Sequence, residues 1–142
     1  MSADFGVHTY RWRDAARELR AIRHAVFVVE QRVPESLEWD DADATSLHAL
    51  ARSASGEAIG CARLLPDGHI GRVAVLVAWR RRGAGSALLR RLIDEARARG
   101  HARVLLNAQI DAMPFYARYG FVARGDVFDE AGIAHRVMER AL

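Results

Sequence analysis

Lysine is missing from this chain of 142 residues, so all 21 of its basic residues are arginine. Cysteine is nearly missing. Cys61 excludes an intramolecular disulfide and a multi-cysteine metal site, and we expect it to pack within a strand. The histidines and carboxylates show no spacing typical of metal ligands, so we expect no metal. No run of residues is long and apolar enough to span a membrane, and we expect no membrane partner.

The net charge is also small. A formal charge of +3 at pH 7 does not by itself argue for nucleic acid as a partner. The arginines do not alternate with exposed aromatic residues, and an acidic segment opposes such binding, so we expect no nucleic acid partner. The first ten residues lack the apolar run of a signal peptide, and we therefore expect a cytoplasmic protein.

The chain shows no repeat, linker or low-complexity segment, so we interpret residues 1–142 as a single domain. Half of its residues are apolar, which is enough for one core. Residues 7–12 are predicted to form a strand, and Asp14 can cap a helix that runs to about Val28. Helical spacing predicts the buried face of that helix: Leu19, Ile22, Val26 and Val29.

An acidic segment follows Pro34. Residues 35–43 are predicted to form a loop, which holds five carboxylates and no basic residue. Three runs typical of strands come next, at 46–54, 58–65 and 69–77, separated by short turns that contain glycine. Tight turns between such runs predict an antiparallel meander.

A helix over residues 83–99 has the clearest amphipathic pattern in the chain. The nearly all-apolar run 104–108 suits a buried central strand. Strand 69–77, this helix and strand 104–108 then form a crossover unit whose two strands are parallel.

The C-terminal part begins with a short helix that Pro114 opens and that ends before Gly120. Two further strands are predicted near 121–128 and 134–140. The fold class is therefore α/β (α+β), a mixed sheet with helices packed on it.

A glycine turn joins strand 69–77 to the helix after it. The sequence Arg80-Arg81-Arg82-Gly83-Ala84-Gly85-Ser86 lets the backbone turn sharply beside a helix N-terminus with free N–H groups, which suits a phosphate. A P-loop would need a lysine, and a dinucleotide fingerprint would need glycine or alanine where Leu88 stands. A plain turn before a basic helix is the alternative. The pattern Arg80-x-x-Gly83-x-Gly85 resembles the pyrophosphate loop of the GNAT acetyltransferases.

A second motif extends this resemblance. The strand around Asn107 is followed by Pro114-Phe115-Tyr116-Ala117-Arg118-Tyr119-Gly120-Phe121, similar to the GNAT motif in which a strand leads to a helix with Phe-Tyr and a final Gly-Phe. The resemblance covers roughly the last two thirds of the chain, by the loose boundaries of motif reading. It implies the GNAT fold, a mixed and mostly antiparallel sheet with a central splayed pair of parallel strands and flanking helices.

Shorter stretches resemble the small bacterial ElaA-like branch of that family. They are Phe27-Val28-Val29-Glu30-Gln31, residues 38–48 and Gly132-Ile133-Ala134-His135. Two positions depart from common GNAT sequences, because Val77 replaces a frequent proline and Arg81 replaces a frequent glycine. Neither change removes a backbone N–H donor from the glycine turn.

The resemblance implies acetyl-CoA as cosubstrate and a set of residues that hold it. Backbone groups of Val73 and Val75 would contact the pantetheine arm, and Asn107 would hydrogen-bond it. The parallel strands would splay apart beyond Val77 and Asn107. The glycine turn would hold the pyrophosphate, with Arg72 adding positive charge nearby. The residues of that turn are Arg80, Arg81, Arg82, Gly83, Ala84, Gly85 and Ser86.

Acetyl transfer to an amine is attack of the neutral amine on a thioester, which needs a base, donors for the oxyanion and a proton for the leaving thiolate. Tyr116 is predicted to give that proton, and a half-buried structural aromatic is the alternative. The base stays open between ordered water and several residues. These acceptor-side candidates are Glu30, Glu38, Asp40, His48 and His135.

The acceptor is expected to be a primary amine of a small molecule or a protein. The acidic segment 35–43 and Glu30 could attract it as a cation, or could serve only as a solvated loop. A noncatalytic acyl-CoA-binding sensor on the same fold is the alternative function. Loops build the acceptor pocket and vary freely on one fold, so the acceptor itself stays open. We expect a monomer or a homodimer.

Overall fold

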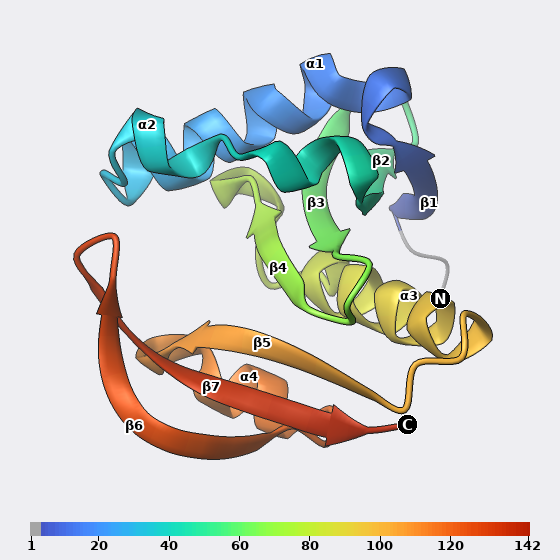
Figure 1. Ribbon diagram of the computed structural model, residues 1–142. Coiled ribbons are helices and arrows are strands. Elements are labelled where there is room, and N and C mark those ends of the chain that lie inside the picture. Colours follow the sequence, from blue (N-terminus) through green and yellow to red (C-terminus); the bar gives the residue numbers. More distant parts are fainter. Residues whose placement is uncertain (1–3) are drawn as a thin grey trace.

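Two antiparallel sheets form the centre of the computed structural model, which describes residues 4–142 (Figure 1). The segment assessed for a signal peptide includes residues 1–3, which lie outside the described part. The first sheet has the order β1-β2-β3-β4: Phe5–Arg11, Leu47–Ser53, Ala58–Leu64 and Ile70–Val75. The second has the order β5-β7-β6, with β5 at Arg103–Gln109, β6 at Val122–Glu130 and β7 at Ile133–Ala141.

One parallel bridge, between His69 and Leu105, joins β4 to β5. The Leu105 N–H donates to the Gly68 carbonyl at 3.2 Å, and beyond this point the two strands separate. We expected the separation only beyond Val77 and Asn107, and that boundary was wrong. A bulge interrupts the pairing of β4 with β3 between Gly71 and Ala74, and bulges bend the strand that carries them.

Helices cover both faces of the first sheet (Figure 1). On one face lie α1 (Trp12–Arg23), a π-helical turn η1 (His24–Glu30), α2 (Glu35–Glu38) and a 3-10 turn η2 (Asp41–Thr45). On the other lies α3 (Ala84–Ala98), whose leucines meet β3 in the larger core cluster. The short helix α4 (Met113–Ala117) follows β5 after a 3-10 turn η4 (Ile110–Ala112).

Three local expectations near the N-terminus were wrong. The first helix begins at Trp12 with Arg11 at the N-cap, so Asp14 lies inside the first turn and caps nothing. Val29 is 63% exposed, because the wider π-helical turn rotates it off the face that buries Val26. Residues 35–43 are not a plain loop, since they form α2 and most of η2.

The mixed fold with a central parallel pair and flanking helices is confirmed. Cys61 is 1% exposed within β3, as expected. Sequence patterns did not show that β7 lies between β5 and β6, which leaves one edge of β5 free to face β4.

Candidate active site

A cleft of about 1030 Å³ opens where β4 and β5 separate. Its walls come from η1, α2, β4, the start of α3, β5, α4 and the β6–β7 hairpin. The cleft brings together nine residues predicted from the sequence: Val73, Val75, Arg80, Gly85, Asn107, Tyr116, Glu38, Asp40 and His135. Seven other predicted site residues are not among its lining residues: Glu30, His48, Arg81, Arg82, Gly83, Ala84 and Ser86.

The glycine turn lies between the end of β4 and α3, with a 3-10 turn η3 (Val77–Trp79) before it. Gly83 is the N-cap of α3 and has a left-handed φ of 88°, which favours glycine. No side chain of the described residues caps this helix, so the first-turn N–H groups of Ala84, Gly85 and Ser86 remain available for an anion. The Ser86 hydroxyl accepts a hydrogen bond from Tyr119 at 2.5 Å.

Gly85 lies where this turn meets the cleft. A Cβ at that position would stand 3.7 Å from Phe115 and 3.9 Å from Val75, at ordinary contact distances. A larger side chain would press on Phe115 and Val75 and occupy space at the cleft wall that Gly85 leaves open. The turn therefore fits the pyrophosphate of a CoA cosubstrate.

The arginines around this turn are less available than the sequence suggested. Arg80 donates to both carboxylate oxygens of Glu30 at 2.6 Å and to the Val75 carbonyl at 2.9 Å. The hydrogen bonds from Arg80 hold the pKa of Glu30 below its ordinary value. Arg82 lies over the Trp79 ring, 4.9 Å from its centroid. Arg81 has a φ of 64°, at a position where glycine is common in the family.

The bulge in β4 lies at Arg72 and Val73. Cys61 pairs with Ala74 and Arg63 pairs with Gly71, so neither bulge residue has a partner in the ladder. Arg72 adopts a left-handed φ of 51°, which is strained for an arginine. Because Val73 lies outside the ladder and lines the cleft, its backbone N–H can serve as an oxyanion donor of the kind that the chemistry requires.

A buried ion cluster holds the side chain of Arg72 away from the glycine turn. Its Nε lies 3.0 Å from a Glu38 oxygen, and Nη2 lies 3.3 Å from Asp40. The expectation that Arg72 adds charge at the phosphate site was therefore wrong. The cluster also contains Arg23, which donates to Glu38 and Asp43, and Arg63, which donates to Asp40 and Asp43.

Three arginines face three carboxylates in this cluster, so its formal charges cancel. Glu38 is 3% exposed and Asp43 is 4% exposed. Burial alone would raise the pKa of Asp40, but Arg63 and then Arg72 hold it below its ordinary value. Three of the five carboxylates of the acidic segment, Glu38, Asp40 and Asp43, are therefore paired with arginine rather than free. Sequence patterns missed this because the partners lie 15 to 34 residues apart.

Tyr116 lies on α4 and lines the cleft. Its ring packs edge-on against Phe115 at 5.1 Å and Phe121 at 5.9 Å. Burial raises the pKa of its phenol to about 12, so it is protonated at neutral pH and can donate a proton.

The two candidate histidines have different surroundings. His48 is 1% exposed, lies outside the cleft lining and donates through Nε2 to the Asp43 carbonyl at 2.9 Å. Burial holds its pKa below the ordinary value, and its role is structural. His135 lines the cleft, with Nδ1 2.7 Å from the Ile133 carbonyl and Nε2 3.5 Å from Glu130. Sequence reasoning missed Glu130, which accepts from Asn107 at 3.3 Å.

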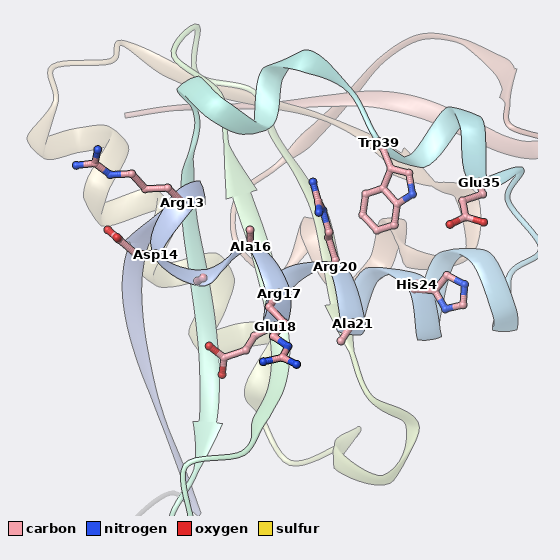
Figure 2. Close-up of a pocket in the computed structure, with 11 residues that line it drawn as sticks. Arg13, Asp14, Ala16, Arg17, Glu18, Arg20, Ala21, His24, Glu35 and Trp39 are labelled. Atoms are coloured by element: carbon pink, nitrogen blue, oxygen red, sulfur yellow. The ribbon is translucent and has the colours of Figure 1, made fainter.

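A second hollow, of about 1300 Å³, lies along the outer side of α1 (Figure 2). Glu35 and Trp39 line it together with residues of α1 and the start of η1, such as Arg20 and His24. None of the site residues predicted from the sequence lines this hollow, so the cleft is the candidate site. Within residues 4–142, no group of three or more His, Cys, Asp and Glu side chains is arranged to hold a metal. No helix of this part is long and apolar enough to cross a membrane.

Comparison with known proteins places this geometry in a family. The model of the acetyltransferase (GNAT) domain matches residues 13–142. The uncharacterized N-acetyltransferase YjcF of Bacillus subtilis is 34% identical over 121 residues, covering 82% of this chain and 86% of YjcF. Escherichia coli ElaA is 32% identical over 130 residues, covering 86% of this chain and 84% of ElaA.

Solved structures agree. The crystal structure of Escherichia coli ElaA superposes with a TM-score of 0.84 at 29% identity, covering 96% of this chain and 99% of that one. An acyl-CoA N-acyltransferase from Pseudomonas aeruginosa gives a TM-score of 0.86 at 33% identity, with the same coverage. The chain belongs to the GNAT acetyltransferase family, and its fold is that of the acyl-CoA N-acyltransferases. The expected kinship with ElaA is confirmed.

Proposed function

We propose that this protein is an N-acetyltransferase that transfers the acetyl group of acetyl-CoA to a primary amine by direct attack. The observation that carries the proposal is one cleft lined by Gly85 of an uncapped helix N-terminus, by a bulged strand and by the half-buried Tyr116 phenol. These supply, in that order, an anion site, oxyanion donors and a proton donor. Family membership supports acyl transfer from an acyl-CoA.

Each group in the cleft has its own role in the proposed reaction. The N–H groups from Arg81 to Ser86 bind the pyrophosphate, and the backbone of Val73 and Val75 aligns the pantetheine arm beside Asn107. As the amine nitrogen bonds to the carbonyl carbon, the C–S bond breaks and Tyr116 gives its proton to the thiolate. Tyr116 recovers a proton from the acetylated nitrogen through water, so protons balance without a fixed base.

Free thiol release from acetyl-CoA, measured across a panel of primary amines, tests the proposal. We expect turnover with at least one amine, and much slower turnover with the Gly85→Val variant at the same low acetyl-CoA concentration. A chain that binds CoA and releases no thiol with a broad panel is instead a noncatalytic acyl-CoA-binding sensor. If thiol release from propionyl-CoA has a higher kcat/KM than release from acetyl-CoA, the transferred group is an acyl group longer than acetyl.

The proposal includes a cytoplasmic location, a small-molecule or protein amine as acceptor, and neither metal nor nucleic acid as partner. These parts stay predictions. Light scattering, which measures the molecular mass in solution, distinguishes a monomer from a homodimer.

A further inference from the structure

One carboxylate on the wall of the cleft has no arginine beside it. Glu130 ends β6, and its side chain is 51% exposed at the rim. Among the described residues its polar side-chain neighbours are the Asn107 amide, which donates to Oε1 at 3.3 Å, and His135 Nε2, 3.5 Å from Oε2. Glu130 therefore presents a negative charge to a ligand that enters the cleft.

The other carboxylates that line the cleft are already occupied. Glu38 and Asp40 belong to the ion cluster, whose charges cancel. Asp67 accepts from the His69 backbone at 3.0 Å, and it lies at the closed end, where the bridge from His69 joins β4 to β5. The charge that we first attributed to the acidic segment is thus supplied by Glu130, on the opposite wall.

The neighbour of Glu130 on β7, His135, has a ring that is fixed in place. His135 is 7% exposed, and its Nδ1 must donate to the Ile133 carbonyl, because a carbonyl oxygen only accepts. Its ring also stacks on Phe128, with centroids 5.9 Å apart. A neutral imidazole carries one N–H, and here Nδ1 holds it, so the neutral ring places an unprotonated Nε2 3.5 Å from Glu130 and does not donate to the carboxylate.

The reacting amine is a poor partner for such a carboxylate. A nearby negative charge favours the ammonium form, and the ammonium form has no lone pair for attack. Binding energy from a part of the substrate that does not react carries no such cost. A permanent charge at the rim therefore suits a second cationic group on the acceptor, with the reacting amine deeper in the cleft near Tyr116.

We propose that Glu130, which accepts from the Asn107 amide, binds a non-reacting cationic group of the acceptor, so that the acceptor class is a diamine or polyamine. This rests on the proposed acetyl transfer. The probes are three five-carbon amines with different far ends: 1,5-diaminopentane (cationic), n-pentylamine (neutral) and 5-aminopentanoate (anionic). The measurement is kcat/KM for each, from thiol release with acetyl-CoA.

We expect the diamine to be preferred over n-pentylamine, and Glu130→Gln to reduce that preference by about fivefold, the upper range for a partly exposed ion pair. The matched control is Asp129→Asn, which removes an exposed charge from the residue that precedes Glu130 in β6. Asp129 lies outside the cleft lining, so this variant should keep the preference. Equal kcat/KM for the diamine and the neutral amine in the unaltered protein would overturn the proposal, as would an unchanged preference in Glu130→Gln.

Calorimetry of 1,5-diaminopentane with the CoA-saturated protein separates this proposal from the proposed function. If no amine is acetylated, acetyl transfer fails, yet weaker diamine binding in Glu130→Gln than in Asp129→Asn still supports the site. If amines are acetylated and diamine binding is equal in both variants, acetyl transfer stands and the role of Glu130 is wrong.

Discussion

The two ends of the cleft are built in different ways. At the cofactor end, the groups offered to a ligand are backbone N–H groups of the glycine turn and of the bulge in β4. At the acceptor end, most charged side chains are paired with one another, and Glu130 is an exception. A cosubstrate common to a whole family can be bound by backbone, whereas the choice of acceptor depends on a few side chains.

The strongest test of the cofactor end of the cleft is Gly85→Val. The branched side chain would crowd Phe115 and Val75 at the wall of the cleft, and we expect it to hinder close approach of the pyrophosphate to the N–H groups of the turn. Loss of one or two charge-assisted hydrogen bonds, each worth about 1.5–3 kcal/mol, predicts roughly 100-fold weaker CoA binding. Isothermal titration of CoA measures the change.

The control for this variant is Gly6→Val, which adds the same side chain to an exposed position of β1. Apart from the two chain neighbours, His8 is the one residue in the described part that would lie within 4 Å of the added Cβ. The control should leave CoA affinity unaltered. A folded Gly85→Val protein that binds CoA as tightly as Gly6→Val would show that the pyrophosphate lies elsewhere.

Tyr116→Phe tests the chemistry between the two ends. Because the hydroxyl matters mainly in the transition state, we expect kcat to fall about 100-fold with little change in KM for acetyl-CoA. Steady-state thiol release measures both constants. Tyr10→Phe, which removes a hydroxyl on β1 that accepts from Arg52 at 3.0 Å, should keep the original kcat. Equal kcat values in the two variants would mean that the thiolate leaves without help from Tyr116.

The cofactor end of the cleft could be predicted from the sequence because the residues that form it are close together along the chain. Gly83 and Gly85 stand two residues apart at the start of a helix, and Phe115 and Tyr116 are adjacent. The splayed strands, by contrast, depend on the bulge at Arg72, which has no pattern of its own in the sequence.

The acceptor end could not be predicted in the same way. Glu38 has its partners in Arg23 and Arg72, 15 and 34 residues away on two other elements. Read along the chain, it looks like one of five free carboxylates. Glu130 reaches Asn107 and His135 only because β7 runs between β5 and β6, and strand order is not visible in local periodicity.

Glu38→Gln tests whether the acidic segment is structural. Breaking one side of a buried ion pair leaves Arg23 and Arg72 without full compensation, so we expect the free energy of unfolding to fall by about 3 kcal/mol. Urea unfolding measures it. Glu35→Gln, an exposed position of the same α2 helix, should change stability very little. If Glu38→Gln is as stable as the unaltered protein but has a raised KM for amines, the acidic segment takes part in binding the acceptor.

The smallest expected effect is a pH dependence of stability from His48, which the structure assigns to the fold and not to the cleft. Its neutral ring is buried beside Trp12, with Arg23 and Arg63 nearby, and burial holds its pKa below the ordinary value of about 6.5. As the pH falls below that value the unfolded chain binds a proton that the folded chain does not. The unfolded state is then favoured, so stability falls with falling pH through this window.

Urea unfolding at pH 7 and pH 5 measures this loss, which should be smaller in His48→Gln than in the exposed control His8→Gln. We expect the difference between the two variants to be well below the effect of Glu38→Gln. The same His48 variant, once folded, should keep its KM for amines, since the histidine lies outside the cleft lining. If His48→Gln has a raised KM for amines and the same pH dependence of stability as the unaltered protein, His48 contributes to acceptor binding. That result would contradict its assignment to the fold.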